Sequence, residues 1–435
     1  MKLTGKYIWV DGDIVTPAPD STVIVTDPEV KWHGKGRITV YDRPRQTVLG
    51  FGGAFTEAAA HNYALLPDAE KKKALELLFG ENGLAYNFCR VTLGGCDFSL
   101  DGYRYASRED LADFSIEHDR KEIIPFIRDA IACSKRGITL FASPWSPPAF
   151  FKDTGELTRG KLREDAYEPY AMYFCRFLKA YRDEGIPISA VTVQNEPGLH
   201  RWEGCAWDDD SLIRFTGCLL DTFEKEGLDT KVLCWDYNRG GMFDHISRMY
   251  DSPVGKRVWG AGFHWYNGVH TGELDVTHDC YPDKVLVETE FCHGLGARMY
   301  DRYRLELMDV LNHHTNAVVE WNLMLDWQGG PYHNRDIGCN APVIRNEENQ
   351  VETRDIYRQT YLFSHFIRPG AKVLYTSSAF RQVMTLAVRN PDGKYLIYLC
   401  NNGSCDLTST VCFGDTRWDT EVPMGCVVLF EAESE

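Results

Sequence analysis

The chain contains the stretch Ile188-Ser189-Ala190-Val191-Thr192-Val193-Gln194-Asn195-Glu196-Pro197, an apolar and β-branched run that ends in a carboxylate. Such a run is typical of a strand buried on both faces of a parallel sheet. The stretch Lys284-Val285-Leu286-Val287-Glu288-Thr289-Glu290 repeats the pattern further along the chain. A carboxylate just beyond a buried strand is costly to place unless chemistry requires it. The two stretches therefore predict a parallel sheet with a functional site at the ends of its strands.

Similar apolar runs alternate with helical patterns from about residue 48 to residue 322. The eight candidate strands are 48–53, 85–91, 138–142, 188–195, 231–236, 259–265, 284–290 and 316–322. Between them, Pro67-Asp68 opens a helical segment that Gly80 closes, and residues 119–135 carry a second helical pattern. Alternation of this kind predicts a (β/α)8 TIM barrel, which we place at residues 48–355, with its site at the C-terminal ends of the strands.

Both ends of the chain have a different pattern, in which short strand-like runs are separated by turns. Residues 1–47 contain such runs at 7–10, 23–25 and 38–41. After a helical pattern near 354–367, the C-terminal part at 356–435 alternates in strand fashion, and Asn390-Pro391-Asp392-Gly393 is a strong hairpin signal. We therefore expect the two ends to form one β-sandwich beside the barrel.

Composition excludes several classes of protein. The net charge of −16 argues against nucleic acid as a partner, because a polyanion requires a basic face. No apolar run is long enough for a membrane span, and no metal or nucleotide motif suggests a cofactor. The fourteen cysteines are scattered without metal spacing, as expected of reduced core thiols. With no signal-like segment after Met1, we expect a cytoplasmic protein if Met1 is the native start.

The carboxylates suggest a chemistry. Two carboxylates from different strands suit an acid and a nucleophile that flank a glycosidic bond, which predicts a glycoside hydrolase. Glu196 is the candidate proton donor, Asn195 can bind a sugar hydroxyl, and Pro197 favours extended backbone before it. In the second stretch, Glu290 is the preferred nucleophile because it lies nearer the rim. Glu288 is the alternative, although a deeper position beside a buried cation such as Arg90 suits it better.

The chain also resembles glycoside hydrolase family 30, and within it the glucosylceramidase branch. The stretches that carry the resemblance are 50–60 (GFGGAFTEAAA), 86–91 (YNFCRV), 96–99 (CDFS), 142–148 (ASPWSPP), 190–197 (AVTVQNEP), 264–266 (HWY), 289–294 (TEFCHG), 321–323 (WNL) and 329–331 (GGP). This resemblance covers nearly the whole chain. It implies a barrel fused to a β-sandwich and a retaining mechanism without a cofactor.

The resemblance also implies roles for individual residues. It makes Glu196 the general acid/base and Glu290 the nucleophile. The implied sugar pocket uses Glu57, Trp145, Asn195 and Trp321, while Arg90 and Tyr266 hold the nucleophile and Tyr266 also borders the substrate. Arg90 is suited to keep Glu290 ionised. His264 either lines the cleft or satisfies a strand hydrogen bond.

Two departures from the family pattern bear on the choice of sugar. Glu57 stands where the branch usually has Asp, and the stretch 332–340 has an apparent one-residue insertion. Asp336 is the best match there for a family Asn near the sugar 6-hydroxyl, with Asn334 as the alternative. Trp202 and Trp207 either form a subsite for the leaving group or pack within their own loop. His313-His314 is interpreted as a solvated pair.

The sequence therefore predicts a retaining β-glycosidase that acts on small β-glycosides from the non-reducing end, with β-glucosides preferred. The alternatives within enzymes are a β-xylosidase, a β-fucosidase or a β-galactosidase with the same catalytic pair. Two further alternatives are a transglycosylase, which shares these residues, and an inactive sugar-binding protein. The sequence does not indicate an oligomeric state.

Overall fold

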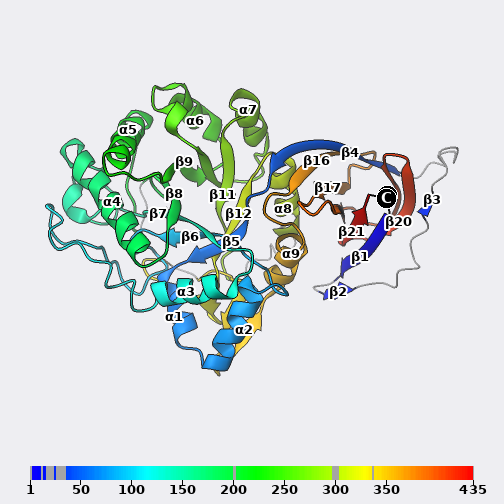
Figure 1. Ribbon diagram of the computed structural model, residues 1–435, viewed down its shortest axis with the longest axis horizontal. Coiled ribbons are helices and arrows are strands. Elements are labelled where there is room, and N and C mark those ends of the chain that lie inside the picture. Colours follow the sequence, from blue (N-terminus) through cyan, green and yellow to red (C-terminus); the bar gives the residue numbers. More distant parts are fainter. Residues whose placement is uncertain are drawn as a thin grey trace. The chain divides into compact units, whose positions relative to one another are not determined.

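The structure, a computed structural model, describes residues 2–10, 13–15, 24–25, 36–198, 202–295, 303–335 and 338–434. The chain forms two compact units, which can be followed by colour in Figure 1. The barrel unit comprises residues 51–298 and 317–354. The sandwich unit comprises residues 1–50, 299–316 and 355–435, and is therefore built mainly from the two ends of the chain.

Eight strands close into a parallel barrel that follows the order of the chain, which confirms the predicted TIM barrel. They are β5 (Gly50–Phe55), β6 (Phe88–Thr92), β7 (Thr139–Ser143), β8 (Ile188–Thr192), β9 (Lys231–Asn238), β10 (Gly260–His264), β11 (Val285–Phe291) and β12 (Ala317–Asn322). Gly52 in β5 has a packing reason, because a Cβ there would lie 1.9 Å from the Phe88 carbonyl oxygen of β6. Every predicted strand is present, with ends that differ by a few residues.

Helices follow most of these strands. They are α1 (Glu57–Ala64), α2 (Asp68–Phe79), α3 (Ile123–Cys133), α4 (Tyr167–Asp183), α5 (Asp209–Lys225), α6 (Met242–Asp251) and α7 (Gly272–Cys280). Helix α3 begins later than the predicted residue 119, because the buried Asp119 carboxylate accepts hydrogen bonds from the hydroxyls of Tyr103, Tyr105 and Tyr181. A small sheet of β13 (Met324–Asp326), β14 (Val343–Arg345) and β15 (Val351–Thr353) completes the unit.

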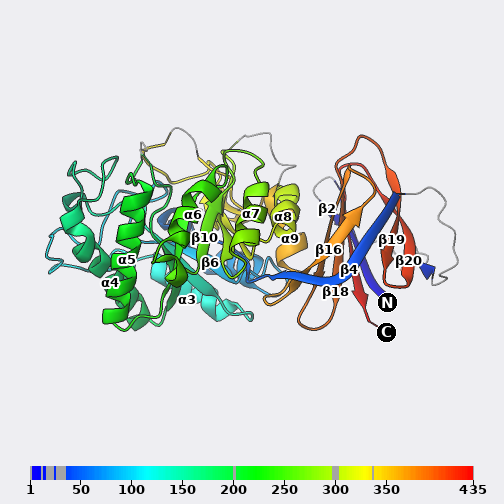
Figure 2. The ribbon, with the colours of Figure 1, turned by 90° about the horizontal axis from the view of Figure 1, so that it is seen from above.

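The sandwich unit contains one sheet of ten strands. Their order is β2 (Asp13–Val15), β1 (Lys2–Val10), β21 (Val427–Glu433), β18 (Tyr395–Asn401), β17 (Val383–Arg389), β16 (Lys372–Ser378), β4 (Gly36–Thr47), β19 (Leu407–Phe413), β20 (Thr416–Val422) and β3 (Ile24–Val25). The first and last long strands, β1 and β21, pair antiparallel, so the two termini lie together in Figure 2. The predicted hairpin at 390–393 joins β17 to β18.

This sheet folds over a single core, as the predicted sandwich requires. Trp418 of β20 packs against Phe430 of β21 with ring centroids 5.6 Å apart, and Tyr395 of β18 packs against Phe413 of β19 at 4.9 Å. The strands in each pair are not neighbours in the sheet, so these contacts cross from one layer to the other. Helices α8 (Tyr303–Asn312) and α9 (Asp355–Ser364) complete this unit.

The segment 299–316 lies within the predicted barrel domain, but it groups with the sandwich unit. The reason is local, because α8 packs against α9 and against the strands β16 and β17. Among the described helices, none combines the length and the apolar character needed to cross a bilayer.

Candidate active site

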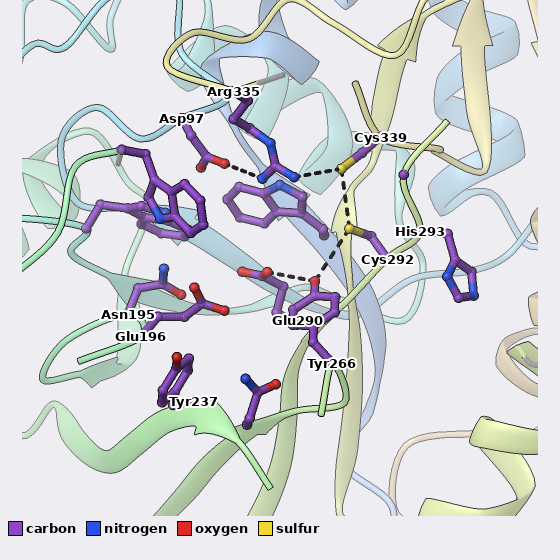
Figure 3. A pocket seen from close by; sticks show the side chains of 15 residues that line it. Asp97, Asn195, Glu196, Tyr237, Tyr266, Glu290, Cys292, His293, Arg335 and Cys339 are labelled. Atoms are coloured by element: carbon purple, nitrogen blue, oxygen red, sulfur yellow. Dashed lines mark hydrogen bonds and ion pairs between the residues drawn. The ribbon is translucent and has the colours of Figure 1, made fainter. Parts of the chain in front are cut away.

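A cavity of about 470 Å³ opens at the C-terminal ends of the barrel strands (Figure 3). Most of its lining comes from strand ends, and we call these residues the strand-end group. They are Trp145, Asn195, Glu196, Tyr237, Asn238, Tyr266, Glu290, Cys292, His293, Gly294 and Trp321. The remaining lining residues come from loops further from the strands, and we call them the loop group. They are Asp97, Trp202, Arg335 and Cys339.

The two predicted catalytic carboxylates meet in this cavity. One carboxylate oxygen of Glu196, one of Glu290 and a ring nitrogen of His264 all lie within 4.8 Å of one another. Both side chains are largely buried, with 9% and 7% exposure for Glu196 and Glu290. Register explains part of this proximity, because His264 of β10 pairs with Glu290 of β11.

Arg90 connects three strand ends beneath the cavity. Its fully buried guanidinium donates to Glu290 Oε2 at 2.7 Å, to Asn195 Oδ1 at 2.8 Å and to Asp236 Oδ2 at 2.9 Å. Its Nε donates to Ser143 Oγ at 2.9 Å. The carboxylates that Arg90 contacts are thus those of Glu290 and Asp236, which corrects the expectation that Glu288 is its partner. Glu288 is buried in β11 and does not line the cavity.

Opposing effects act on the Glu290 carboxyl group. Burial raises the pKa of Glu290 above its ordinary value, and the positive charges of His264 and Arg90 limit that rise. The Tyr266 hydroxyl donates to Glu290 Oε1 at 2.8 Å and further stabilises the ionised form. Three groups, Arg90, Tyr266 and His264, therefore surround the carboxylate from which a nucleophile would attack.

His264 lies behind the two carboxylates, as a supporting residue. It is fully buried, and its ring nitrogens lie 3.1 Å from Glu196 Oε1 and 3.1 Å from Asp236 Oδ1. Burial lowers the pKa of His264, but Glu290, Asp236 and Glu196 outweigh that effect and raise it to about 10. An imidazolium therefore stands between the carboxylates at neutral pH. His264 is not among the residues that line the cavity, and its side chain contacts Glu196 and Asp236 behind them.

Asp236 belongs to the site but was missed from the sequence. Burial alone would raise its pKa, yet Arg90, His264 and Thr192 lower it, so the group stays ionised. The signal was available, since Leu233-Cys234-Trp235-Asp236 is another apolar run that ends in a carboxylate. Positive φ angles at Trp235 (70°), Asp236 (66°) and Glu196 (46°) mark strained backbone at these two strand ends.

Trp145 and Trp321 provide the aromatic surface that the sequence predicts. Their rings stack with centroids 4.9 Å apart, and the Arg90 guanidinium lies 4.7 Å from the Trp145 ring centroid. Both line the cavity next to Asn195. This arrangement presents apolar ring faces beside hydrogen-bonding groups, which is the composition of a site for a small polar ring.

Glu57, which the sequence predicts for the sugar pocket, is not among the residues that line the cavity. Glu57 begins α1, and its carboxylate accepts from the Leu100 backbone amide at 2.9 Å and contacts His118 Nε2 at 2.5 Å. The first turn of α1 also contacts the 96–100 loop through the backbone, because the Ala58 amide donates to the Phe98 carbonyl at 2.9 Å. Asp97, from the loop after β6, lines the cavity together with the two catalytic carboxylates.

Asp97 is held by Arg335, which the sequence also missed. Arg335 Nη1 donates to Asp97 Oδ2 at 2.5 Å, and the guanidinium lies over the rings of Phe98 and Trp202 at 5.1 and 5.7 Å. Burial raises the pKa of Asp97, while Arg335 opposes the rise. Arg335 thus joins two other members of the loop group, Asp97 and Trp202.

The remaining predictions can be placed briefly. Asp336 lies outside the described residues, and Asn334 is described but does not line the cavity. Trp202 lines the cavity, whereas Trp207 packs against Phe215 and donates to Gln194 Oε1 at 3.2 Å. The one buried group of potential metal ligands among the described residues is Glu196, His264 and Glu290, and the hydrogen bonds above already engage all three.

Comparisons with known proteins agree with this geometry. The model of the glycosyl hydrolase family 30 TIM-barrel domain matches residues 48–367. The lysosomal acid glucosylceramidase of Mus musculus is 30% identical over 401 residues, which are 84% of this chain and 77% of that protein. The endo-1,6-beta-D-glucanase neg1 of Aspergillus fumigatus is 26% identical, with 89% of this chain and 85% of that protein covered.

Among solved structures, SrfJ from Salmonella typhimurium matches with a TM-score of 0.92 at 26% identity, covering 99% of this chain and all of that chain. The family model spans more than half of the chain and includes all the strand ends that line the cavity. The chain therefore belongs to glycosyl hydrolase family 30.

Proposed function

We propose that this family 30 hydrolase is a retaining β-glycosidase that releases a terminal β-linked glucose from small glycosides. The observation that carries the proposal is the proximity of the Glu196 and Glu290 carboxylates, whose nearest oxygens lie within 4.8 Å. Carboxyl groups about 5–5.5 Å apart are typical of retaining enzymes, whereas inverting enzymes separate them by roughly 6.5–9.5 Å to admit a water molecule.

Glu290 is the proposed nucleophile. Its oxygens are oriented by Arg90 Nη1 and the Tyr266 hydroxyl, so the carboxylate has one fixed direction of attack. Attack at the anomeric carbon forms a covalent glycosyl–enzyme and breaks the bond to the leaving oxygen. Arg90 is a positioning residue, because it also fixes Asn195 and Asp236.

Glu196 is the proposed acid/base, and the charge balance of the cluster supports this role. Arg90 and His264 are two cations, and they offset the charges of Glu290 and Asp236. Glu196 is then the carboxyl group that can hold a proton without leaving a net negative charge in a buried site. It donates the proton to the leaving group and later removes one from water.

The sugar is proposed to bind between the tryptophans and the polar residues of the wall. In this proposal Trp145 and Trp321 contact the apolar side of a pyranose, Asn195 binds the 2-hydroxyl, and Asp97 binds hydroxyls at the far side of the ring; all four residues line the cavity. The glucosylceramidase relative supports glucose as the sugar. The endo-1,6-glucanase relative supports a second candidate, cleavage within β-1,6-glucan chains.

The test is the initial rate of the purified protein on 4-nitrophenyl glycosides and on β-1,6-glucan. The panel contains the β-glucoside, β-xyloside, β-fucoside, β-galactoside and α-glucoside. We expect preference for the β-glucoside, with retention of the anomeric configuration in the first product seen by NMR. Preference for another β-glycoside would change the proposed sugar specificity. Release of oligosaccharides from the glucan would favour the second candidate, cleavage within β-1,6-glucan. A product of inverted configuration would reject the retaining mechanism.

A further inference from the structure

Two cysteine thiols that the proposed mechanism does not use lie in the same cavity. Cys292 follows β11 two residues after Glu290, and Cys339 lies in the loop between β13 and β14. Their sulfur atoms are 3.4 Å apart, and both residues line the cavity as free thiols. A small reagent that enters the cavity can therefore reach both sulfurs.

The backbone holds the two thiols opposite each other. Gly294 and Cys339 form an antiparallel bridge. The Asn340 amide donates to the His293 carbonyl at 2.8 Å, and the Leu295 amide donates to the Gly338 carbonyl at 2.9 Å. The approach needed to form a disulfide, from 3.4 Å to about 2.05 Å, is thus a movement of side chains within paired segments.

We propose that Cys292 and Cys339 form a site of reversible oxidation, where a hydroperoxide closes them into a disulfide that lowers the activity. The consequence for activity rests on the proposed function, whereas disulfide formation does not. The Tyr266 hydroxyl contacts both Cys292 and Glu290, so it links this thiol pair to a catalytic carboxylate (Figure 3). No other described pair of thiols has such a link.

The order of events follows from the charges around the sulfurs. Arg335 Nη2 lies 3.8 Å from Cys339 Sγ, so a cation stands beside the thiolate that the reaction requires. The contact with Cys339 and burial raise the pKa of the Cys292 thiol well above its ordinary value. Because Arg335 lies beside Cys339, we assign Cys339 as the sulfur that attacks first and Cys292 as the one that resolves the product.

The chemical steps balance. The Cys339 thiolate attacks one oxygen of hydrogen peroxide and breaks the O–O bond, which gives a sulfenic acid and, after proton uptake, one water. The Cys292 sulfur attacks the sulfenic sulfur and expels hydroxide, which leaves as a second water with the thiol proton. Two electrons pass from the two thiols to the peroxide. A dithiol reductant reverses the reaction.

Disulfide formation changes the surroundings of the nucleophile. The Tyr266 hydroxyl lies 2.8 Å from Glu290 Oε1 and 3.4 Å from Cys292 Sγ. Oxidation draws the Cys292 sulfur toward Cys339, so the Tyr266 hydroxyl loses its sulfur acceptor and its side chain is no longer held on that side. The hydrogen bond that orients Glu290 then weakens, and we expect kcat to fall by about tenfold, the effect of losing one hydrogen bond to a charged group.

The experiment treats the full-length protein with hydrogen peroxide, alkylates the remaining thiols and maps peptides by mass spectrometry without reduction. We expect a cross-linked peptide pair that contains Cys292 and Cys339, a loss of kcat, and recovery of both thiols and activity with dithiothreitol. Failure to find this cross-link after oxidation overturns the proposal. If the protein is an active enzyme and the disulfide forms without any loss of activity, the proposed effect of the disulfide on Glu290 is overturned.

Two variants separate this pair from general oxidation. Cys339→Ser cannot form the bond, so the ratio of its treated to untreated activity should stay near one. Cys280→Ser removes an exposed cysteine of α7 and should respond to peroxide as the unaltered protein does. Equal sensitivity of all three proteins would reject the assignment. If no glycoside is hydrolysed, the peptide map still decides on the disulfide, and only the proposed function fails.

Discussion

The strand-end group and the loop group share one cavity but are positioned by different means. Glu196, Glu290 and Trp321 stand at or just past the ends of strands, where the register of a closed barrel fixes each Cα. Asp97 and Arg335 belong to loops and reach the cavity through contacts with each other and with aromatic rings. The strand ends carry the reacting carboxylates, and the loops shape the wall around them.

The difference teaches where chemistry and specificity reside in this barrel. A residue at a strand end contributes to the reaction in a geometry that the fold maintains. A loop residue can change with little effect on the barrel, because it does not take part in the pairing of the barrel strands. We therefore expect substitutions in the strand-end group to affect kcat most, and substitutions in the loop group to affect substrate binding and the choice of sugar.

The largest effect is expected for Glu290→Gln. The amide keeps the shape of the side chain but cannot form the glycosyl–enzyme, so kcat should fall by at least about 10⁴-fold. The measurement is the steady-state rate on the preferred nitrophenyl glycoside, with circular dichroism to show that the variant is folded. Activity close to that of the unaltered protein would reject Glu290 as the nucleophile.

Glu196→Ala should have a smaller and more selective effect. Loss of the proton donor should slow glycosides with poor leaving groups by about 10²–10⁴-fold, while activated aryl glycosides still form the glycosyl–enzyme. Azide should then restore turnover, because it replaces water without needing a base. The check is the rate with and without azide and the configuration of the glycosyl azide. No rescue, or an equal loss on all leaving groups, would contradict this role.

Much of the strand-end group could be predicted from the sequence, for a physical reason. A carboxylate that ends a β-branched run can be recognised from the sequence alone, and the barrel topology then brings such strand ends together. Glu196, Glu290, Trp145 and Trp321 all meet at the cavity. Asp236 carries the same signal and was missed because its run was interpreted only as a strand.

The loop group could not be predicted in this way. Glu57 and Asp97 both follow barrel strands, and nothing in the spacing shows that the first turn of α1 directs Glu57 toward Leu100 and His118. Arg335 and Cys339 depend on contacts between segments far apart in the chain. Such contacts are set by packing in three dimensions, so the sequence indicates the loops but not which side chains enter the cavity.

Asp236→Asn tests whether the buried charges support the strand ends. Arg90 and His264 would each lose a carboxylate partner, and we expect a loss of about 3–5 kcal/mol in the free energy of unfolding, measured with urea at pH 7. A change below about 1 kcal/mol would contradict the central place of Asp236 in the cluster.

The same variant has a pH signature. The folded pKa of His264 is raised from 6.5 to about 10, so its stabilising contribution is complete below about pH 6.5 and is lost as the pH rises through 10. Asp236→Asn removes one of the carboxylates that raise the pKa of His264. The stabilising contribution of His264 should therefore be lost at a lower pH than in the unaltered protein. Unfolding curves between pH 6 and 10 measure the shift, and His264→Gln should lack this component altogether.

The smallest effects on activity are expected at Glu57 and Asp97, the acids that follow β5 and β6. Asp97→Asn removes a charged hydrogen-bond acceptor from the cavity wall and should lower kcat/KM by about 10–100-fold, mostly through KM. Glu57→Gln keeps an acceptor for the Leu100 amide outside the cavity, so kcat/KM should stay within about threefold. Both variants are measured on the β-glucoside and on the β-xyloside, which lacks the 6-hydroxymethyl group.

A larger loss of kcat/KM for Glu57→Gln than for Asp97→Asn would return Glu57 to the sugar pocket. It would also show that the α1 start and the 96–100 loop rearrange when substrate binds. The predicted order, with Asp97 dominant, requires that the wall seen in this structure is the wall that the sugar meets.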